Sequence, residues 1–175
     1  MKHALPTLLL IMLSSCAAKQ GNYDFRALAH AAIELDMDID EGDFHKLYIE
    51  AADWIGVPYR AGGNDRRGTD CSGLVCAIYK KVYHKRLERN SDDQRTRNCS
   101  KVRKANLDEG DLVFFHNGRS KRTATHVGIY LKDGKFVHAS SKLGVTVSSL
   151  EEDYWTKTWM QGGRVKGVKR KSGKQ

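Results

Sequence analysis

The hydrophobic pattern of the chain changes its period near residue 110, and this change constrains the fold more than any other feature. Before it, apolar residues recur at helical spacing over 44–55 and 71–83. After it come segments rich in β-branched and aromatic residues that read as strands: DLVFFH (111–116), HVGIYL (126–131), KFVHAS (135–140) and GVTVSSL (144–150). This order predicts an α+β domain with N-terminal helices packed on an antiparallel sheet of about five to six strands.

Specific residues set the ends of the predicted helices. Asp43 is placed to cap the first helix, and Gly56 and Pro58 end it. A glycine-rich loop, PYRAGGNDRRGTD, leads to the second helix, and a polar loop follows over 84–109. The inward stripe of the second helix consists of Leu74, Val75, Ile78, Tyr79 and Val82. A possible last strand lies around GGRVKGV, after the aromatic segment YWTKTWM.

The first sixteen residues carry the pattern of an export signal. Lys2 precedes an apolar run over 4–13 that is too short to span a bilayer. The segment Leu13-Ser14-Ser15-Cys16 resembles the bacterial lipobox, which implies cleavage before Cys16 and lipid attachment to it; the alternative is a plain signal peptide with a chance cysteine. The expected division is a lipoprotein signal peptide (1–15), a lipid-anchored linker with a short helix over 25–35 (16–42), one domain (43–168) and a basic tail (169–175).

The net charge is strongly positive. It is +9 for the whole chain, and loss of Lys2 with the signal peptide lowers it by one to +8. Such a charge favours an anionic partner such as cell wall or lipid headgroups, and export argues against nucleic acid. Solvated basic loops and a disordered tail explain the charge equally well.

Three cysteines remain if Cys16 is lipidated. They are Cys71, Cys76 and Cys99, and an odd number leaves at least one thiol without a partner in the same chain. A free thiol in an oxidising compartment needs a reason. Cys76 and Cys99 could pair, but Cys76 is equally compatible with the core. Cys71, at the start of the helix over 71–83, could be a core residue, half of a disulfide, a metal ligand or a nucleophile.

The position of Cys71 suits a nucleophile. A helix N-terminus lowers a thiol pKa, and its first-turn N–H groups can bind a developing oxyanion. A catalytic thiol also needs a histidine close in space. His126 opens a strand, and His138 in the next strand could orient its ring, while His116 is the competing candidate. No CxxC or HExxH spacing supports a metal site, so we expect no metal and no cofactor.

The turn between the two histidine-bearing strands decides whether His126 and His138 cooperate. A two-residue turn at Asp133-Gly134 would pair Ile129 with His138 and leave the two histidines on opposite faces. A turn with an odd number of residues, or a β-bulge, would bring them to one face. We therefore predict such an irregularity.

Four motifs in order, GVPYRAGG, TDCSGLV, GDLVFF and HVGIYLKDGKFVHASS, resemble the NlpC family of papain-like bacterial cell-wall cysteine peptidases. The similarity runs from about residue 43 to 168. It implies Cys71 as nucleophile, His126 as general base and His138 as the orienting residue. It also implies substrate-binding roles for Tyr59, Asp70 and Ser72; loop packing or helix capping are the alternatives for these three.

The same resemblance implies a substrate and a location. The substrate class is the stem peptide of peptidoglycan, cleaved at the bond between γ-D-glutamate and a diamino acid. We expect a monomer in the cell envelope, anchored by lipid to the outer membrane and facing the periplasm. The alternatives are an amidase or acyltransferase of the same fold, and a non-catalytic wall-binding lipoprotein.

Overall fold

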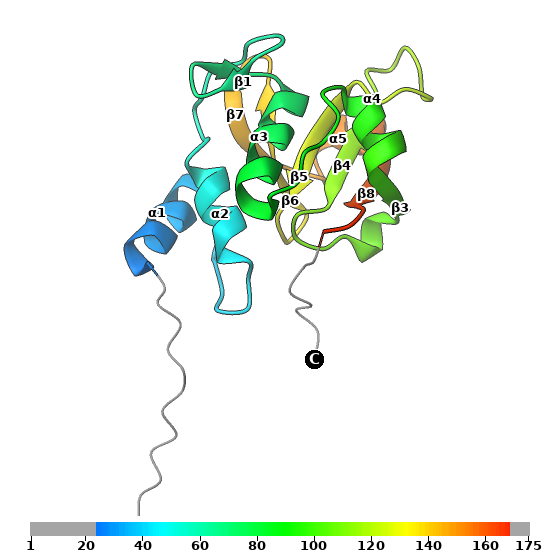
Figure 1. Ribbon diagram of the computed structural model, residues 1–175. Helices are drawn as coiled ribbons and strands as arrows, with labels where there is room; N and C mark the ends of the chain where they lie inside the picture. The colour runs from blue at the N-terminus through cyan, green and yellow to red at the C-terminus, as the bar shows by residue number, and fades with distance from the viewer. Residues whose placement is uncertain (1–23, 169–175) are drawn as a thin grey trace, which may run out of the picture.

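A six-stranded antiparallel sheet forms the centre of the protein (Figure 1). The computed structural model describes residues 24–168, so the predicted signal peptide, the Cys16 attachment site and the tail over 169–175 lie outside the described residues. The strand order is β3-β8-β4-β5-β6-β7, and a separate ribbon pairs β1 with β2. The strands are β1 (Asn64–Asp65), β2 (Gly68–Thr69), β3 (Cys99–Val102), β4 (Leu112–Phe115), β5 (His126–Tyr130), β6 (Lys135–Ser140), β7 (Gly144–Ser149) and β8 (Trp159–Val165).

Helices cover both faces of this sheet. They are α1 (Phe25–Leu35), α2 (His45–Ala52), α3 (Cys71–Tyr83), α4 (Ser91–Asp93) and α5 (Asp153–Thr158), with a π-helical turn at Gln94–Asn98 and a 3₁₀ turn at Lys104–Asn106. On one face α3 packs against β5 and β6, and α2 packs against α3. On the other face Trp155 of α5 packs on Phe115 and Phe136. The predicted α+β class with an antiparallel sheet of five to six strands is confirmed.

The strands follow the alternation expected for a sheet buried on both faces. In β4, Leu112 and Phe114 point into the α3 core, whereas Val113 and Phe115 point toward α5. The four predicted strands are present, and the predicted last strand is β8. The loop predicted over 84–109 is wrong in part, because it contains the edge strand β3. The sequence of β3, CSKV, has little strand signal, so its pairing with β8 comes from tertiary context.

The helix predicted in the linker belongs to the packed domain. Its bounds are those expected, but Ala31 and Leu35 of α1 are fully buried in the same core as α2. The packed unit therefore extends to α1 and does not begin at residue 43. The predicted cap of α2 also differs: Phe44 is the N-cap residue, and the Asp43 carboxylate instead pairs with Lys132 at 2.6 Å.

Burial of Leu35 gives a test of this boundary. The side chain is 1% exposed, so Leu35→Ala should lower the free energy of unfolding by about 2–5 kcal/mol. Ile33 lies on the same helix but is 77% exposed, so Ile33→Ala should change stability by less than about 0.5 kcal/mol. Urea unfolding of both variants measures the difference. Equal small effects would show that α1 behaves as a linker.

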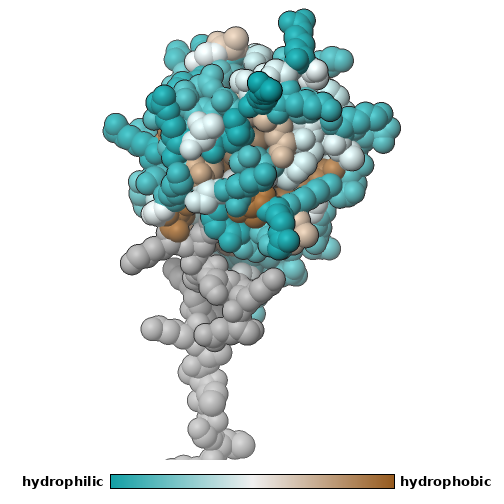
Figure 2. All heavy atoms as spheres, turned by 90° about the vertical axis from the view of Figure 1, so that its right-hand side faces the viewer, coloured by the Kyte–Doolittle hydropathy of each residue, from teal (hydrophilic) through white to brown (hydrophobic). Residues whose placement is uncertain are grey.

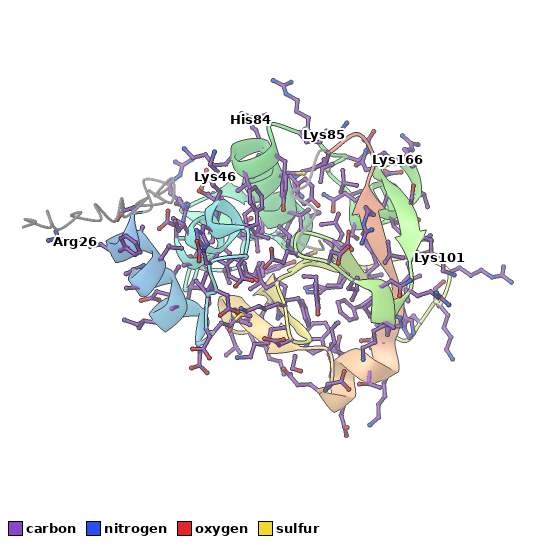
Figure 3. The ribbon with its side chains drawn as sticks, turned by 90° about the horizontal axis from the view of Figure 1, so that it is seen from below. Arg26, Lys46, His84, Lys85, Lys101 and Lys166 are labelled. Atoms are coloured by element: carbon purple, nitrogen blue, oxygen red, sulfur yellow. The ribbon has the colours of Figure 1, made fainter. Side chains whose placement is uncertain are left out.

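The basic residues do not form one patch on the face seen from below. Arg26, Lys46, His84, Lys85, Lys101 and Lys166 extend there from different parts of the fold (Figure 3). The side of the molecule that carries β3 is mostly hydrophilic (Figure 2). This distribution fits solvated basic side chains. Within residues 24–168, no helix has the length and apolar character needed to cross a bilayer.

Candidate active site

Asp70 fixes the start of α3. It is the N-cap residue, and its Oδ1 accepts a hydrogen bond from the Gly73 amide at 2.8 Å. Its Oδ2 accepts from the Gly62 amide at 2.8 Å, which ties the glycine-rich loop to the helix. Arg89 donates to both oxygens, at 2.7 and 2.8 Å. These contacts fit the capping interpretation of Asp70, because both of its oxygens are already used within the protein.

Gly73 allows this junction to close. A Cβ at this position would lie 2.1 Å from the Gly63 carbonyl oxygen and 3.1 Å from Arg89 Nη2. The carbonyl of Gly63 also accepts from Arg89 Nη2 at 2.8 Å. The loop backbone, the Arg89 guanidinium and the first turn of α3 thus pack without space for a side chain. This packing holds Cys71 at the first helical position.

The Cys71 thiol is half-buried at the end of α3 nearest β5. Burial raises its pKa, and the charge of Asp70 adds to this effect. Hydrogen bonds from the backbone amides of Val127, Ser72 and Cys71 itself act in the opposite direction but are weaker. The sequence-based expectation of a lowered thiol pKa is therefore wrong for the resting protein. The first-turn amides do favour the thiolate, but burial outweighs them.

The turn between β5 and β6 has three residues. The register pairs Tyr130 with Phe136 and Ile129 with Val137, and the Leu131 amide donates to the Lys135 carbonyl at 2.9 Å. The loop consists of residues 132–134, and Asp133 and Gly134 both have positive φ. In this register Gly128, not Ile129, lies opposite His138, and His126 is on the same face as Gly128. The predicted odd-residue turn is confirmed.

The two histidines form a hydrogen-bonded pair. His126 Nε2 lies 3.1 Å from His138 Nδ1, and His138 Nε2 lies 3.2 Å from Ser148 Oγ on β7. Trp155 stacks on the His126 ring at 5.2 Å and meets the His138 ring edge-on at 4.8 Å. Burial lowers the pKa of His126 to about 4. Burial, together with His126, lowers the pKa of His138 to about 3, so both rings are neutral near pH 7.

Cys71 meets the end of β5 where β5 and β6 part. The pairing of β5 with β6 stops at Ile129 and Val137. The first three residues of β5, from His126 to Gly128, lie beyond it. The backbone amide of Val127, the residue after His126, lies close enough to the Cys71 thiol to favour its thiolate form. The competing candidate, His116, follows β4; it is buried, and its Nδ1 accepts from the Gly118 amide at 3.0 Å. His116 thus supports a loop, whereas His126 adjoins the residue that contacts the thiol.

Tyr59 and Ser72 lie beside the thiol. Tyr59 is 39% exposed, and burial followed by the nearby Cys71 and Asp70 raises its pKa. Ser72 is buried; its hydroxyl donates to Asp70 Oδ1 at 3.2 Å and accepts from Arg89 Nη1 at 2.7 Å. Tyr59 is thus the more accessible of the two, and substrate contact by Tyr59, Asp70 or Ser72 stays a prediction.

Sequence reasoning missed Arg89, Ser148 and Trp155. Each contacts a predicted site residue from a distant part of the chain, and no motif marks it. No disulfide joins the three cysteines within residues 24–168, so the possible Cys76–Cys99 pair is not formed. Cys76 Sγ instead contacts the Glu88 carbonyl at 3.3 Å.

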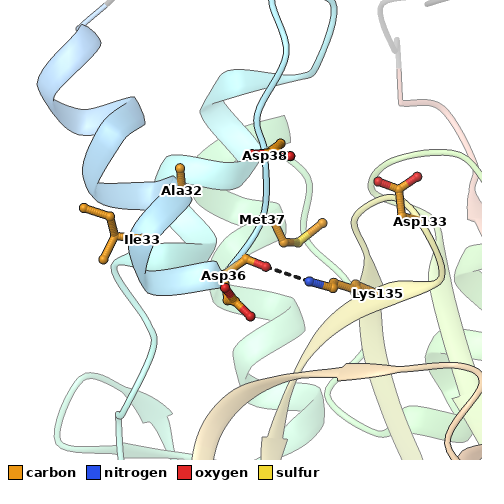
Figure 4. A pocket seen from close by; sticks show the side chains of 7 residues that line it. All are labelled: Ala32, Ile33, Asp36, Met37, Asp38, Asp133 and Lys135. Atoms are coloured by element: carbon orange, nitrogen blue, oxygen red, sulfur yellow. Dashed lines mark hydrogen bonds between the residues drawn. The ribbon is translucent and has the colours of Figure 1, made fainter.

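A pocket of about 430 Å³ lies away from this site, between the end of α1 and the β5–β6 loop (Figure 4). Lys135 Nζ there donates to the Asp36 carbonyl at 2.6 Å. The lining residues are Ala32, Ile33, Asp36, Met37, Asp38, Asp133 and Lys135. Across the described part of the chain, no group of three or more His, Cys, Asp or Glu side chains is placed to hold a metal ion.

Known proteins match this chain over most of its length. Residues 56–164 match the NlpC/P60 family. The chain is 35% identical over 167 residues to the murein DD-endopeptidase MepS/murein LD-carboxypeptidase of Escherichia coli strain K12, covering 89% of this chain and 87% of the relative. It is 41% identical over 116 residues to the gamma-DL-glutamyl hydrolase of Bacillus subtilis strain 168, covering 66% and 27%. A crystal structure of an NlpC/P60 family protein from Bacillus cereus superposes with a TM-score of 0.62 at 29% identity, covering 69% of this chain and 39% of that one.

Proposed function

Because the chain belongs to the NlpC/P60 family, we propose that it is a peptidoglycan endopeptidase in which Cys71 attacks a stem-peptide amide bond. One observation carries the proposal: His126 and His138 form a hydrogen-bonded pair, and the backbone amide of Val127, the residue after His126, lies close enough to the Cys71 thiol to favour its thiolate. A nucleophile, a neutral base and a group that orients the base are the parts that acyl transfer needs.

The proposed reaction begins from a neutral thiol and a neutral imidazole. As the Cys71 sulfur attacks the scissile carbonyl carbon, His126 takes the thiol proton, and His138 accepts a hydrogen bond from the resulting imidazolium. The oxyanion is stabilised by first-turn amides of α3, with Tyr59 near it. His126 then gives its proton to the leaving amine, which frees a thioester. Water, activated by His126, hydrolyses the thioester and restores the thiol.

The names of the relatives support three candidate bonds. The sequence-based expectation, the γ-D-glutamyl bond to the diamino acid, agrees with the name of the Bacillus subtilis hydrolase. The relative matched over 89% of this chain is instead named a DD-endopeptidase and LD-carboxypeptidase, which favours a D,D bond in a cross-link or a terminal L,D bond of the stem peptide. Mass spectrometry of two defined muropeptides, one uncross-linked tetrapeptide and one D,D-cross-linked dimer, distinguishes them by product mass.

Two added arms of that experiment test the reaction class. Alkylation with iodoacetamide should abolish product formation, whereas EDTA should leave it unchanged. Products that persist after complete alkylation of Cys71 would contradict the thiol mechanism. Muropeptide binding with no product from either substrate would favour the non-catalytic wall-binding alternative, and a product from another amide would favour the amidase or acyltransferase.

The cellular arrangement is part of the same proposal. An export signal over 1–15, lipidation at Cys16 and a monomer on the periplasmic side of the outer membrane would place the domain beside its substrate. Because α1 belongs to the packed domain, the linker predicted after Cys16 would end before Phe25. Palmitate labelling of wild type and Cys16→Ala tests the anchor.

Cleavage should persist in mildly acidic solution. Since burial lowers the pKa of His126 to about 4, the base is neutral above that pH and becomes protonated as the pH falls through it. The acid limb of kcat/KM should therefore lie near pH 4 and not near the ordinary value of about 6.5. The same lowered pKa means that the fold loses stability as the pH drops below about 6.5, because the unfolded state binds the proton first. An acid limb near 6.5, with circular dichroism unchanged, would contradict a buried base.

A further inference from the structure

Ser148 ends a chain of hydrogen bonds that starts at the proposed base. The chain runs from His126 Nε2 to His138 Nδ1 over 3.1 Å and from His138 Nε2 to Ser148 Oγ over 3.2 Å. Ser148 lies on β7, and β7 pairs with β6 along its whole length, so the hydroxyl is held on a regular ladder. His138 is 2% exposed, and the Trp155 ring lies against both imidazoles.

The distances alone permit either direction for these bonds when both rings are neutral, but only one direction when His126 is charged. A neutral pair can place its protons in either order, because a serine hydroxyl both donates and accepts. An imidazolium at His126 carries a proton on Nε2 and must donate it to His138 Nδ1. His138 then carries its own proton on Nε2, and Ser148 Oγ is the acceptor in line with it.

We propose that Ser148 is a positioning residue: its hydroxyl oxygen accepts a hydrogen bond from the Nε2–H group of His138, which keeps the Nδ1 lone pair of His126 free for the Cys71 proton. The proposal rests on the function proposed above, but the hydrogen-bond order it assigns exists in the protein without substrate. Ser148 touches neither the thiol nor a reacting atom. It acts through His138.

Removing the hydroxyl should favour the wrong tautomer. In Ser148→Ala a proton on His138 Nε2 would be buried without an acceptor, which costs more than an unused lone pair. His138 would then move its proton to Nδ1 and donate to His126 Nε2, and His126 would carry its proton on Nδ1. An imidazole protonated at that nitrogen cannot accept the thiol proton there. We expect kcat to fall roughly 10- to 100-fold, with KM within about twofold.

The first measurement reads the tautomers directly. In ¹⁵N-labelled wild type at pH 7, long-range ¹H–¹⁵N spectra should show His138 and His126 both protonated on Nε2, and Ser148→Ala should move the protons to Nδ1. Wild-type spectra with His138 protonated on Nδ1 would overturn the proposal, whatever the variant does. This readout needs no turnover, so it stands apart from failure of the proposed function.

The second measurement compares matched variants by rate. Ser148→Thr keeps the hydroxyl and should restore wild-type tautomers and at least half of kcat. Thr146 lies on the same strand, directly opposite His138 in the β6–β7 register, but its hydroxyl donates to the Val147 carbonyl. Thr146→Val should therefore leave both readouts unchanged. If Ser148→Ala and Thr146→Val lower kcat equally with unchanged tautomers, Ser148 serves only to pack the strand.

Discussion

Replacing Cys71 by alanine should abolish cleavage of defined muropeptides and leave the fold intact. Alanine removes the sulfur atom that forms the proposed thioester, while Asp70 and Gly73 still cap α3 through their 2.8 Å bond. We expect kcat/KM to fall by about 10⁴-fold or more. Because one half-buried sulfur is lost, the free energy of unfolding should change by no more than about 1 kcal/mol. Mass spectrometry of the products and urea unfolding measure the two effects.

Cys76 provides the matched control on the same helix. It is also a free, half-buried thiol with a pKa raised by burial, but it faces the Glu88 carbonyl and not β5. Cys76→Ala should retain cleavage within about twofold. The assignment fails if Cys71→Ala still releases product, or if only Cys76→Ala removes activity. A loss in both variants with lowered unfolding midpoints would point to the helix and not to the sulfur.

The hydrophobic periodicity predicted those helices and strands that are determined by residues close together in the sequence. The bounds of α3 are those expected, because one continuous stretch of sequence contains its apolar stripe, its cap at Asp70 and its end near His84. Strand β3 and the packing of α1 were missed for the opposite reason. Both depend on partners distant in the chain, β8 for β3 and α2 for α1, and neither carries a pattern that requires them.

In the candidate active site, too, one feature was predictable from local sequence and another was not. The parity of strand register predicted that His126 and His138 share a face only if the turn has an odd number of residues, and the turn has three. The pKa of Cys71 could not be predicted in this way. The helix N-terminus is visible in sequence and lowers the pKa, whereas burial depends on the packing of α3 against the sheet and raises it.

Arg89 illustrates what a motif cannot contain. It lies 18 residues after Cys71 on the polar loop, where a charged residue is expected to be solvated. In the structure its guanidinium joins Asp70, Ser72 and the Gly63 carbonyl, and so ties three parts of the site together. The resemblance to a family indicated Asp70 and Ser72, but it did not indicate Arg89, whose guanidinium hydrogen-bonds both of them.

Replacing Gly128 by alanine should damage the site through the strand that carries His138. A Cβ at Gly128 would lie 2.6 Å from Phe136 Cδ2, 2.9 Å from the Val137 carbonyl oxygen and 3.2 Å from His138 Cβ. Phe136 is fully buried and the carbonyl belongs to the ladder, so β6 must move away from β5. That movement pulls His138 from His126. We expect a loss of about 1–3 kcal/mol in stability and about 100-fold in kcat.

The variant Gly42→Ala is the control for the general effect of adding a methyl group to the backbone. A Cβ there meets no atom within 4 Å, so Gly42→Ala should keep both stability, within about 0.5 kcal/mol, and kcat. In Gly128→Ala the activity loss should exceed what the unfolded fraction explains, and the His126–His138 hydrogen bond should be absent from ¹⁵N spectra of the folded protein. Wild-type kcat in Gly128→Ala with the His126–His138 hydrogen bond intact would mean that the methyl group does not displace β6. Wild-type kcat with that bond lost would remove His138 from the mechanism.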